Sequence, residues 1–108
     1  MVRRMEYRFS ADLWMHHGGS WHFVTVPFED ADEIDEVSTG VQRGFGSVRV
    51  RVTIGSSTWD TSLFPDSKAK SYVLPIKKPV RVKEGLTVGA PVAVSLVLVD
   101  VAGTTPMG

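Results

Sequence analysis

A run of alternating residues in the middle of the chain places the strongest constraint on its fold. Apolar and polar side chains alternate from residue 47 to residue 54. A period of two puts each set on one face of a β-strand. Glycine and serine then allow a turn at residues 55–57, and a second alternation starts at Trp59. Together the two alternations predict a β-hairpin. Its expected inward residues are Val48, Val50, Val52 and Ile54, with Arg49 and Arg51 on the opposite face.

The length and composition of the chain limit the class of protein. With 108 residues there is room for one domain, and the absence of cysteine excludes disulfides and thiolate metal sites. We expect one β-barrel domain over residues 1–101 and a loose tail over residues 102–108. The charged N-terminus lacks the apolar region of a signal peptide, and no apolar run is long enough to span a membrane. We therefore expect a cytoplasmic protein without a membrane partner.

Four more strands are predicted outside the hairpin, and Trp21 and Trp59 are expected in the core. Apolar residues at every third position predict an acidic helix over residues 28–37, ended by Gly40. Pro79 suits the first turn of a second, basic helix over residues 77–84. The pattern predicts a mainly β fold, a small closed or double-split antiparallel barrel of about six strands with two short helices. The four further strands cover residues 5–15, 21–26, 71–74 and 92–99.

Several short motifs are spaced along nearly the whole chain. They are Trp21-x-Phe23-Val24-x-Val26-Pro27, Gly44-Phe45-Gly46, Val48-x-Val50-x-Val52-x-Ile54-Gly55, Trp59-x-Thr61-Ser62-Leu63-Phe64-Pro65, Tyr72-x-Leu74-Pro75 and Val80-Arg81. This series resembles the bacterial family catalogued as domain of unknown function 1905, from about Arg4 to Val99. The resemblance implies a small β-barrel of the double-split type, and it brings no established activity with it.

A second, partial resemblance covers residues 74–89. The motif is Leu74-Pro75-Ile76-x4-Arg81-x3-Gly85-Leu86-x2-Gly89. It is similar to the half-motif of AbrB-type transition regulators, in which a strand ends at Pro, a short helix carries an Arg, and a Gly-Asp turn leads into the last strand. The chain has Ala90 where the acid is expected. The architecture can therefore be shared without shared DNA binding.

Opposite charges are separated along the sequence although the twelve basic and twelve acidic residues cancel. Residues 1–66 carry six basic and ten acidic side chains, whereas residues 67–108 carry six and two. Such a separation can create an electropositive binding face. The alternative is two solvated faces that help to pair neighbouring elements or subunits.

The polar face of the hairpin is the main candidate site. Arg49 and Arg51 share this face, and Trp59 lies on the partner strand. Guanidinium donors beside an aromatic wall can hold an anionic or planar ligand. Alternatively, residues such as Glu33 or Glu36 of the acidic helix supply the counter-charge, and the face is structural.

Ser62 and Arg81 complete the candidate ligand-binding set. Ser62 has no Gly-x-Ser-x-Gly elbow and no sequence-local histidine, so a hydrogen bond near the strand end is expected rather than nucleophilic catalysis. Arg81 either anchors the basic helix to carboxylates or contacts an anion at the start of that helix.

Neither a metal nor a cofactor is expected. His16, His17 and His22 are the only histidines, and adjacent residues in an extended segment point to opposite faces. They predict a surface turn rather than a metal site. The glycine pair Gly44 and Gly46 lacks the third glycine of a dinucleotide fingerprint and the lysine of a P-loop, and it predicts a bend or bulge.

These patterns favour a non-enzymatic module that binds a small anionic or planar ligand or a protein partner. The alternative is an AbrB-like nucleic-acid binder that holds phosphates with four basic residues. Neutral net charge counts against it, because phosphate contacts dominate such affinity, and we expect no specific DNA binding. An enzyme acting on a small anionic or planar substrate is the third hypothesis, without a recognisable catalytic spacing. The four basic residues are Lys77, Lys78, Arg81 and Lys83.

Overall fold

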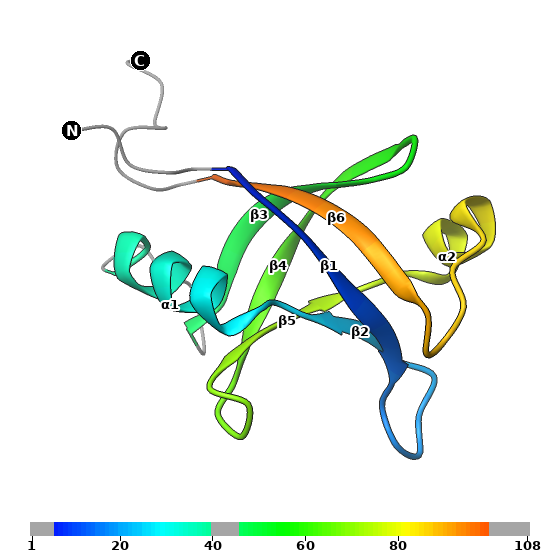
Figure 1. Ribbon diagram of the computed structural model, residues 1–108, viewed down its shortest axis with the longest axis horizontal. Helices are drawn as coiled ribbons and strands as arrows, with labels where there is room; N and C mark the ends of the chain where they lie inside the picture. The colour runs from blue at the N-terminus through cyan, green and yellow to red at the C-terminus, as the bar shows by residue number, and fades with distance from the viewer. Residues whose placement is uncertain (1–5, 40–45, 100–108) are drawn as a thin grey trace.

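The computed structural model describes residues 6–39 and 46–99, and within them antiparallel strands close into a six-stranded barrel (Figure 1). The elements are β1 (Glu6–Met15), β2 (His22–Thr25), α1 (Phe28–Val37), β3 (Val48–Ile54), β4 (Ser57–Asp66), β5 (Ser71–Pro75), α2 (Lys78–Glu84) and β6 (Pro91–Leu98). Around the barrel the strand order is β1-β2-β5-β4-β3-β6, and β6 pairs with β1. The predicted mainly β fold with a closed antiparallel barrel is confirmed.

The β3–β4 hairpin follows its sequence pattern. Val50 and Val52 are fully buried, and Arg51 is exposed on the other face. The turn takes only two residues, and Gly55 in it has a φ of +59°. A Cβ at Gly55 would also collide with the carboxylate of Glu84. The left-handed backbone therefore favours glycine here, and a larger residue would also displace the Glu84 side chain.

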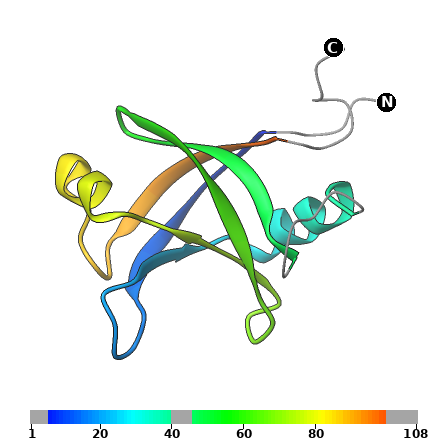
Figure 2. The same ribbon diagram turned by 180° about the vertical axis from the view of Figure 1, so that it is seen from behind.

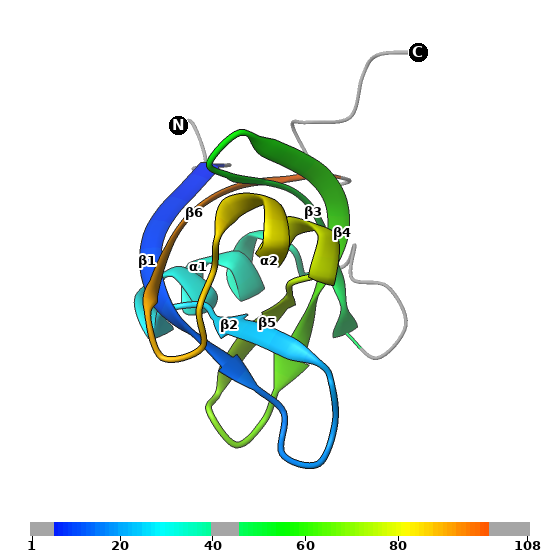
Figure 3. The same ribbon diagram turned by 90° about the vertical axis from the view of Figure 1, so that its right-hand side faces the viewer.

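Helix α1 packs against one end of the barrel, and α2 lies at the other end (Figures 1 and 3). Ile34 of α1 is fully buried in the core. Two tyrosine hydroxyls reach α1 from the strands: Tyr7 donates to Glu33 (3.3 Å) and Tyr72 donates to Asp35 (3.0 Å). The inner side of α1 is thus fixed by the apolar residues Ala31, Ile34 and Val37 and by two hydrogen bonds. Its predicted stop at Gly40 lies outside the described residues.

Helix α2 has no fully buried residue, and it is held by the partly buried Val80 and by polar contacts. Pro79 stands in its first turn, and Gly85 ends it in the left-handed conformation with a φ of +64°, as the sequence predicts. At the C-terminal end, the Glu84 carboxylate accepts hydrogen bonds from the hydroxyls of Ser57 (2.6 Å) and Ser56 (3.1 Å) in the β3–β4 turn. The bond from Ser57 is the main reason that the pKa of Glu84 is lowered.

The barrel interior is apolar and receives side chains from all six strands. The predicted tail over residues 102–108 lies outside the described residues, as does most of the predicted bend at residues 44–46. Figure 2 shows from behind how the β3–β4 hairpin crosses over β5 at one side of the barrel. The buried residues include Tyr7, Leu13, Val24, Val50, Val52, Leu63, Leu74 and Leu96.

Candidate functional site

The outer face of β3 and β4 carries the arginines, and we call Arg49, Arg51, Asp60 and Ser62 the arginine face. Arg51 lies opposite Asp60 in register and forms a bidentate ion pair with it, Nε to Oδ1 at 2.8 Å and Nη2 to Oδ2 at 3.2 Å. The hydrogen bond from Arg51 lowers the pKa of Asp60. Arg49 donates from Nη1 to the Ser62 hydroxyl at 3.2 Å. Both arginines of the arginine face therefore bond to a side chain directly across the strand pair.

Helix α1 does not supply the counter-charge to these arginines, so that expectation is wrong. Glu33 accepts its hydrogen bond from Tyr7 at the barrel end. Within the described residues, Glu36 forms no ion pair with either arginine. The two-residue turn fixes the register of the hairpin and places Asp60 directly beside Arg51, which leaves no need for a charge from another element.

Trp59 lies on the other face of β4 from the arginines. Its register partner is Val52, which is fully buried, and its ring packs partly buried against the core. The indole Nε1 is buried and has no hydrogen-bond partner among the described residues. The structure thus brings Arg49, Arg51 and Ser62 together but not Trp59, which belongs to the wall of the core.

A row of aromatic side chains lies on the outer face of β1 and β2. Trp14 and Phe23 are neighbours in register, with ring centroids 5.1 Å apart. Trp21, just before β2, stacks nearly parallel to Phe23 at 6.1 Å and 9°. Trp14 is fixed further, because its Nε1 donates to the Thr25 hydroxyl at 2.9 Å. The row is therefore a preformed aromatic platform rather than a set of independent side chains.

The platform ends in an open apolar hollow. Trp21 is 64% exposed, so the expectation that it lies in the core is wrong, and Phe64 is 44% exposed. The reason is geometric: Trp21 precedes β2 and stacks on the outward-facing Phe23, and the two described helices lie at the ends of the barrel instead of over this side (Figures 1 and 3). The hollow has a volume of about 320 Å³ and is lined by His16, Trp21, Phe23, Phe64 and Val73.

A second hollow, of about 300 Å³, shares Trp21 with the first and is basic. Lys77 and Lys78 at the start of α2 line it, together with Arg81. Arg81 donates from Nη1 to the Ile76 carbonyl at 2.7 Å, so it anchors α2 to the backbone of the preceding link instead of to a carboxylate. None of the residues that line either hollow is acidic. We call the combined surface the aromatic–basic face; it comprises Trp21, Phe23, Phe64, Val73, Lys77, Lys78 and Arg81.

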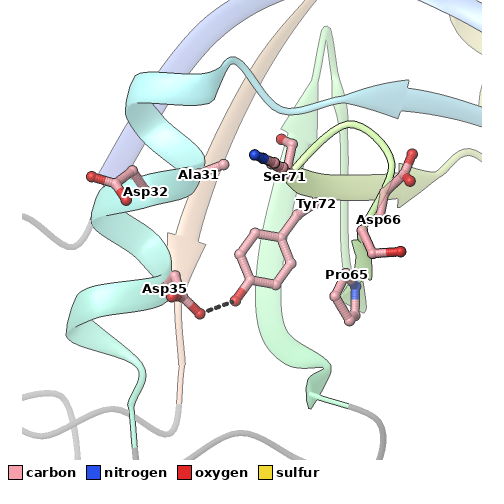
Figure 4. Close-up of a pocket in the computed structure, with 9 residues that line it drawn as sticks. Ala31, Asp32, Asp35, Pro65, Asp66, Ser71 and Tyr72 are labelled. Atoms are coloured by element: carbon pink, nitrogen blue, oxygen red, sulfur yellow. Dashed lines mark hydrogen bonds between the residues drawn. The ribbon is translucent and has the colours of Figure 1, made fainter.

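A larger polar hollow, of about 490 Å³, lies between α1 and the β4–β5 turn (Figure 4). Its polar groups serve the fold. Asp35 accepts from the Tyr72 hydroxyl, and the Ser71 hydroxyl donates to the Val26 carbonyl at 2.5 Å. Asp66 accepts from two backbone N–H groups of its own turn, at 3.1 and 3.4 Å. Asp35, Asp66 and Ser71 are thus bound to another side chain or to the backbone.

Comparison with known protein families shows which family this chain belongs to. The model of the family described as Domain of unknown function (DUF1905) matches residues 9–96, a range that contains β2 to β5 and most of β1 and β6. The chain belongs to this family. No curated protein matches it. The double-split classification and the AbrB similarity of this DUF1905 domain stay predictions.

The described part of the DUF1905 domain contains neither a metal-binding cluster nor a membrane-spanning helix. Within residues 6–39 and 46–99, no three His, Cys, Asp or Glu side chains lie close enough to hold a metal ion. His16 and His17 are exposed in the turn after β1. None of the described helices is long and apolar enough to cross a membrane.

The sequence patterns did not lead to a prediction of the aromatic–basic face, although the spacing of its residues contains part of the information. Trp21 and Phe23 are two residues apart, which places them on one side of an extended segment. Val73 and Phe64 have the outward parity of their strands, opposite to the buried Leu74 and Leu63. The strand order β2-β5-β4, which brings these outward residues together, could not be predicted from the sequence.

Proposed function

We propose that this domain is a non-enzymatic binding module whose binding surface is the aromatic–basic face. One observation carries the proposal: Trp21 is 64% exposed on a stacked platform, beside an apolar hollow and three cationic side chains. A contiguous exposed apolar patch of this kind is typical of ligand- and partner-binding surfaces. Rigid aromatic side chains with nearby cations are also the residues that dominate binding energy at interfaces.

The chemistry of the face selects the kind of ligand. The apolar hollow fits an aromatic or aliphatic group. Lys77 and Lys78 line the second hollow, which shares Trp21 with the first, and they favour acidic groups there. Both an anionic planar molecule and a protein segment with an apolar anchor among carboxylates meet this description. Arg49, Arg51 and Ser62, with their mutual contacts across the hairpin, have a structural role in this proposal.

A hydrolytic or transfer activity receives less support from the same contacts. A nucleophilic serine needs a base within hydrogen-bond reach. Ser62 instead accepts a hydrogen bond from the Arg49 guanidinium, which cannot take up a proton. The cations of the aromatic–basic face are suited to hold an anion in place, and for this reason we favour binding over catalysis.

Nucleic acid is the second candidate, because stacked aromatic side chains beside cations also receive single-stranded bases and phosphates. Lys77, Lys78, Arg81 and Lys83 would contact the phosphates. We expect no specific DNA binding at physiological salt, since few cations are available and the chain is neutral overall. A gel shift with a labelled single-stranded oligonucleotide tests this expectation. A shift that survives excess competitor DNA, and that Lys83→Glu weakens as much as Lys78→Glu, would favour nucleic acid.

A small aromatic anion tests the proposed function directly. Naphthalene-2-sulfonate carries one planar apolar group and one negative charge, and its binding to the wild-type chain can be followed by NMR shifts of backbone amides. We expect shifts at residues 20–23, 64, 73 and 77–81. Uncharged 2-naphthalenemethanol should bind more weakly, because it lacks the attraction to the lysines.

Variants locate the bound probe. Trp21→Ala should remove binding, and Lys78→Glu should weaken it at least severalfold, whereas Arg51→Ala on the arginine face should leave it unchanged. If Arg51→Ala abolishes binding and Trp21→Ala does not, the arginine face is the ligand site and the present proposal is wrong.

A further inference from the structure

The outer side of α1 is an acidic surface with an exposed aromatic residue at its start. Six of the ten residues of α1 are acidic, and none is basic. Phe28 is 60% exposed, and Asp32 and Glu36 are exposed on the same side of the helix, at intervals of four residues. The buried residue Ile34 lies on the opposite side of the helix. Helix α1 therefore presents one phenyl ring followed by a row of carboxylates.

This surface is the chemical complement of the aromatic–basic face. The face offers an apolar hollow of about 320 Å³ and, beside Trp21, the cations Lys77 and Lys78. Helix α1 offers the apolar anchor Phe28 and, one and two turns further on, Asp32 and Glu36. Within the described residues, Asp32 and Glu36 form no ion pair of their own. Each surface thus supplies what the other lacks.

The two surfaces cannot meet within one molecule. Helix α1 is fixed at one end of the barrel by Ile34 and by the hydroxyls of Tyr7 and Tyr72. The lysines of the aromatic–basic face stand at the start of α2, which lies at the other end (Figures 1 and 3). A contact between them must join two copies, and the net charge of zero means that copies do not repel each other as wholes.

We propose that the aromatic–basic face receives helix α1 of a second copy of this chain, so that copies associate head to tail. This inference rests on the proposed function, because it names the partner of the same face. The contact is heterologous: each copy uses a different surface from its neighbour, and a free face and a free helix remain at the two ends. Association of this kind grows into short chains or closes into a ring rather than stopping at a symmetric dimer.

The direct test is sedimentation velocity of the full chain over a range of concentrations. We expect the average mass to rise above the monomer value of 11.9 kDa as concentration increases. Raising the salt from about 0.1 M to about 1 M, which shortens the Debye length from roughly 10 Å to about 3 Å, should lower it again. A mass that stays at 11.9 kDa at every concentration in low salt would overturn the inference.

A pair of complementary variants tests the head-to-tail geometry. One variant, Trp21→Ala with Lys78→Glu, loses the face but keeps the helix; the other, Phe28→Ala with Asp32→Lys, loses the helix surface but keeps the face. Each alone should be monomeric, and their equimolar mixture should form a 1:1 dimer that grows no further. A mixture that stays monomeric, or variants that associate as the wild type does, would contradict the proposal.

Controls separate this inference from the function on which it rests. All four substituted side chains are on the outside, and circular dichroism checks that the variants stay folded. Val97→Ala, on the outer face of β6, should associate like the wild type. If the chain is monomeric but still binds naphthalene-2-sulfonate through Trp21, only the second-copy inference fails. If it neither associates nor binds the probe, the proposed function fails as well.

Discussion

The two outer faces of the barrel obey the same strand alternation but reach opposite outcomes. On the arginine face, Arg51 and Asp60 pair across the hairpin and Arg49 reaches Ser62, so the polar groups are satisfied within the molecule. On the aromatic–basic face, Trp21 stacks on Phe23 and is still 64% exposed. A surface whose polar groups already bond to one another is stabilised little by a partner. Covering exposed aromatic surface, in contrast, lowers the free energy.

Strand β4 contributes residues to both faces and to the core. The largest expected loss of stability comes from a substitution in this strand. Leu63→Ala removes a fully buried side chain and should lower the free energy of unfolding by about 2–5 kcal/mol. Its neighbour Phe64 points outward, and Phe64→Ala should cost less than about 1 kcal/mol. Urea unfolding of both variants gives the two values. Equal losses would mean that the outer aromatic surface is part of the core, and the contrast between the faces would disappear.

Substitution of Trp59 and Trp21 should give the next largest changes in the free energy of unfolding. Trp59→Ala should lower the free energy of unfolding by about 3 kcal/mol, because its ring packs against the core. Trp21→Ala should cost about 1 kcal/mol, the value of one aromatic pair, and should remove binding of naphthalene-2-sulfonate. Thermal unfolding together with the NMR titration separates stability from binding. A large loss of stability in Trp21→Ala would show that its role is structural.

Helix α2 contributes to the aromatic–basic face and is bonded through Glu84 to the start of β4. Substitution of Glu84 should have a smaller effect on stability, and that effect should depend on pH. The folded pKa of Glu84 is below its ordinary value of 4.5, so the folded state holds this proton less tightly than the unfolded state. The resulting stabilisation is present above about pH 4.5 and is lost as pH falls through the lowered pKa. Glu84→Gln should therefore unfold more easily than the wild type at neutral pH, and the two should converge in acid. Unfolding curves at several pH values measure this difference, and a constant difference across the range would contradict it.

The arginine pair should give the smallest effect. Arg51 and Asp60 are about half exposed, and such surface pairs contribute little because water and salt screen them. In a double-mutant cycle with Arg51→Ala and Asp60→Ala, the coupling energy should be small, favourable and lower still at high salt. A strong coupling that does not depend on salt would show that this face contributes more to stability than its exposure indicates.

Local periodicity explains which parts of the fold could be predicted. The alternation around Val50 and Val52 is set by neighbouring residues and is confirmed. In the predicted apolar stripe of α1, Ala31 and Ile34 are buried, whereas Phe28 is exposed. The ion pair of Arg51 was within reach of the sequence, since a two-residue turn at residues 55–56 places Asp60 opposite it. Predicting a three-residue turn at residues 55–57 concealed that register.

The aromatic–basic face could not be predicted in the same way. It joins residues from β2, β4 and β5 with the start of α2, and only the order of strands around the barrel brings them together. Trp21 shows the difficulty most clearly. A large aromatic residue is buried on average. Trp21 is exposed because both described helices pack at the ends of the barrel (Figures 1 and 3), and no local pattern encodes that placement.

The closure of the barrel by β1 and β6 has a consequence for protein engineering. Glu6 is the register partner of Val97, so the first and last described strands run side by side. A host protein could carry this barrel inside one of its surface loops, because the two points of attachment are only one strand spacing apart. Joining them by a short linker and opening the chain at the exposed turn around Gly18 should give a circular permutant with the same fold.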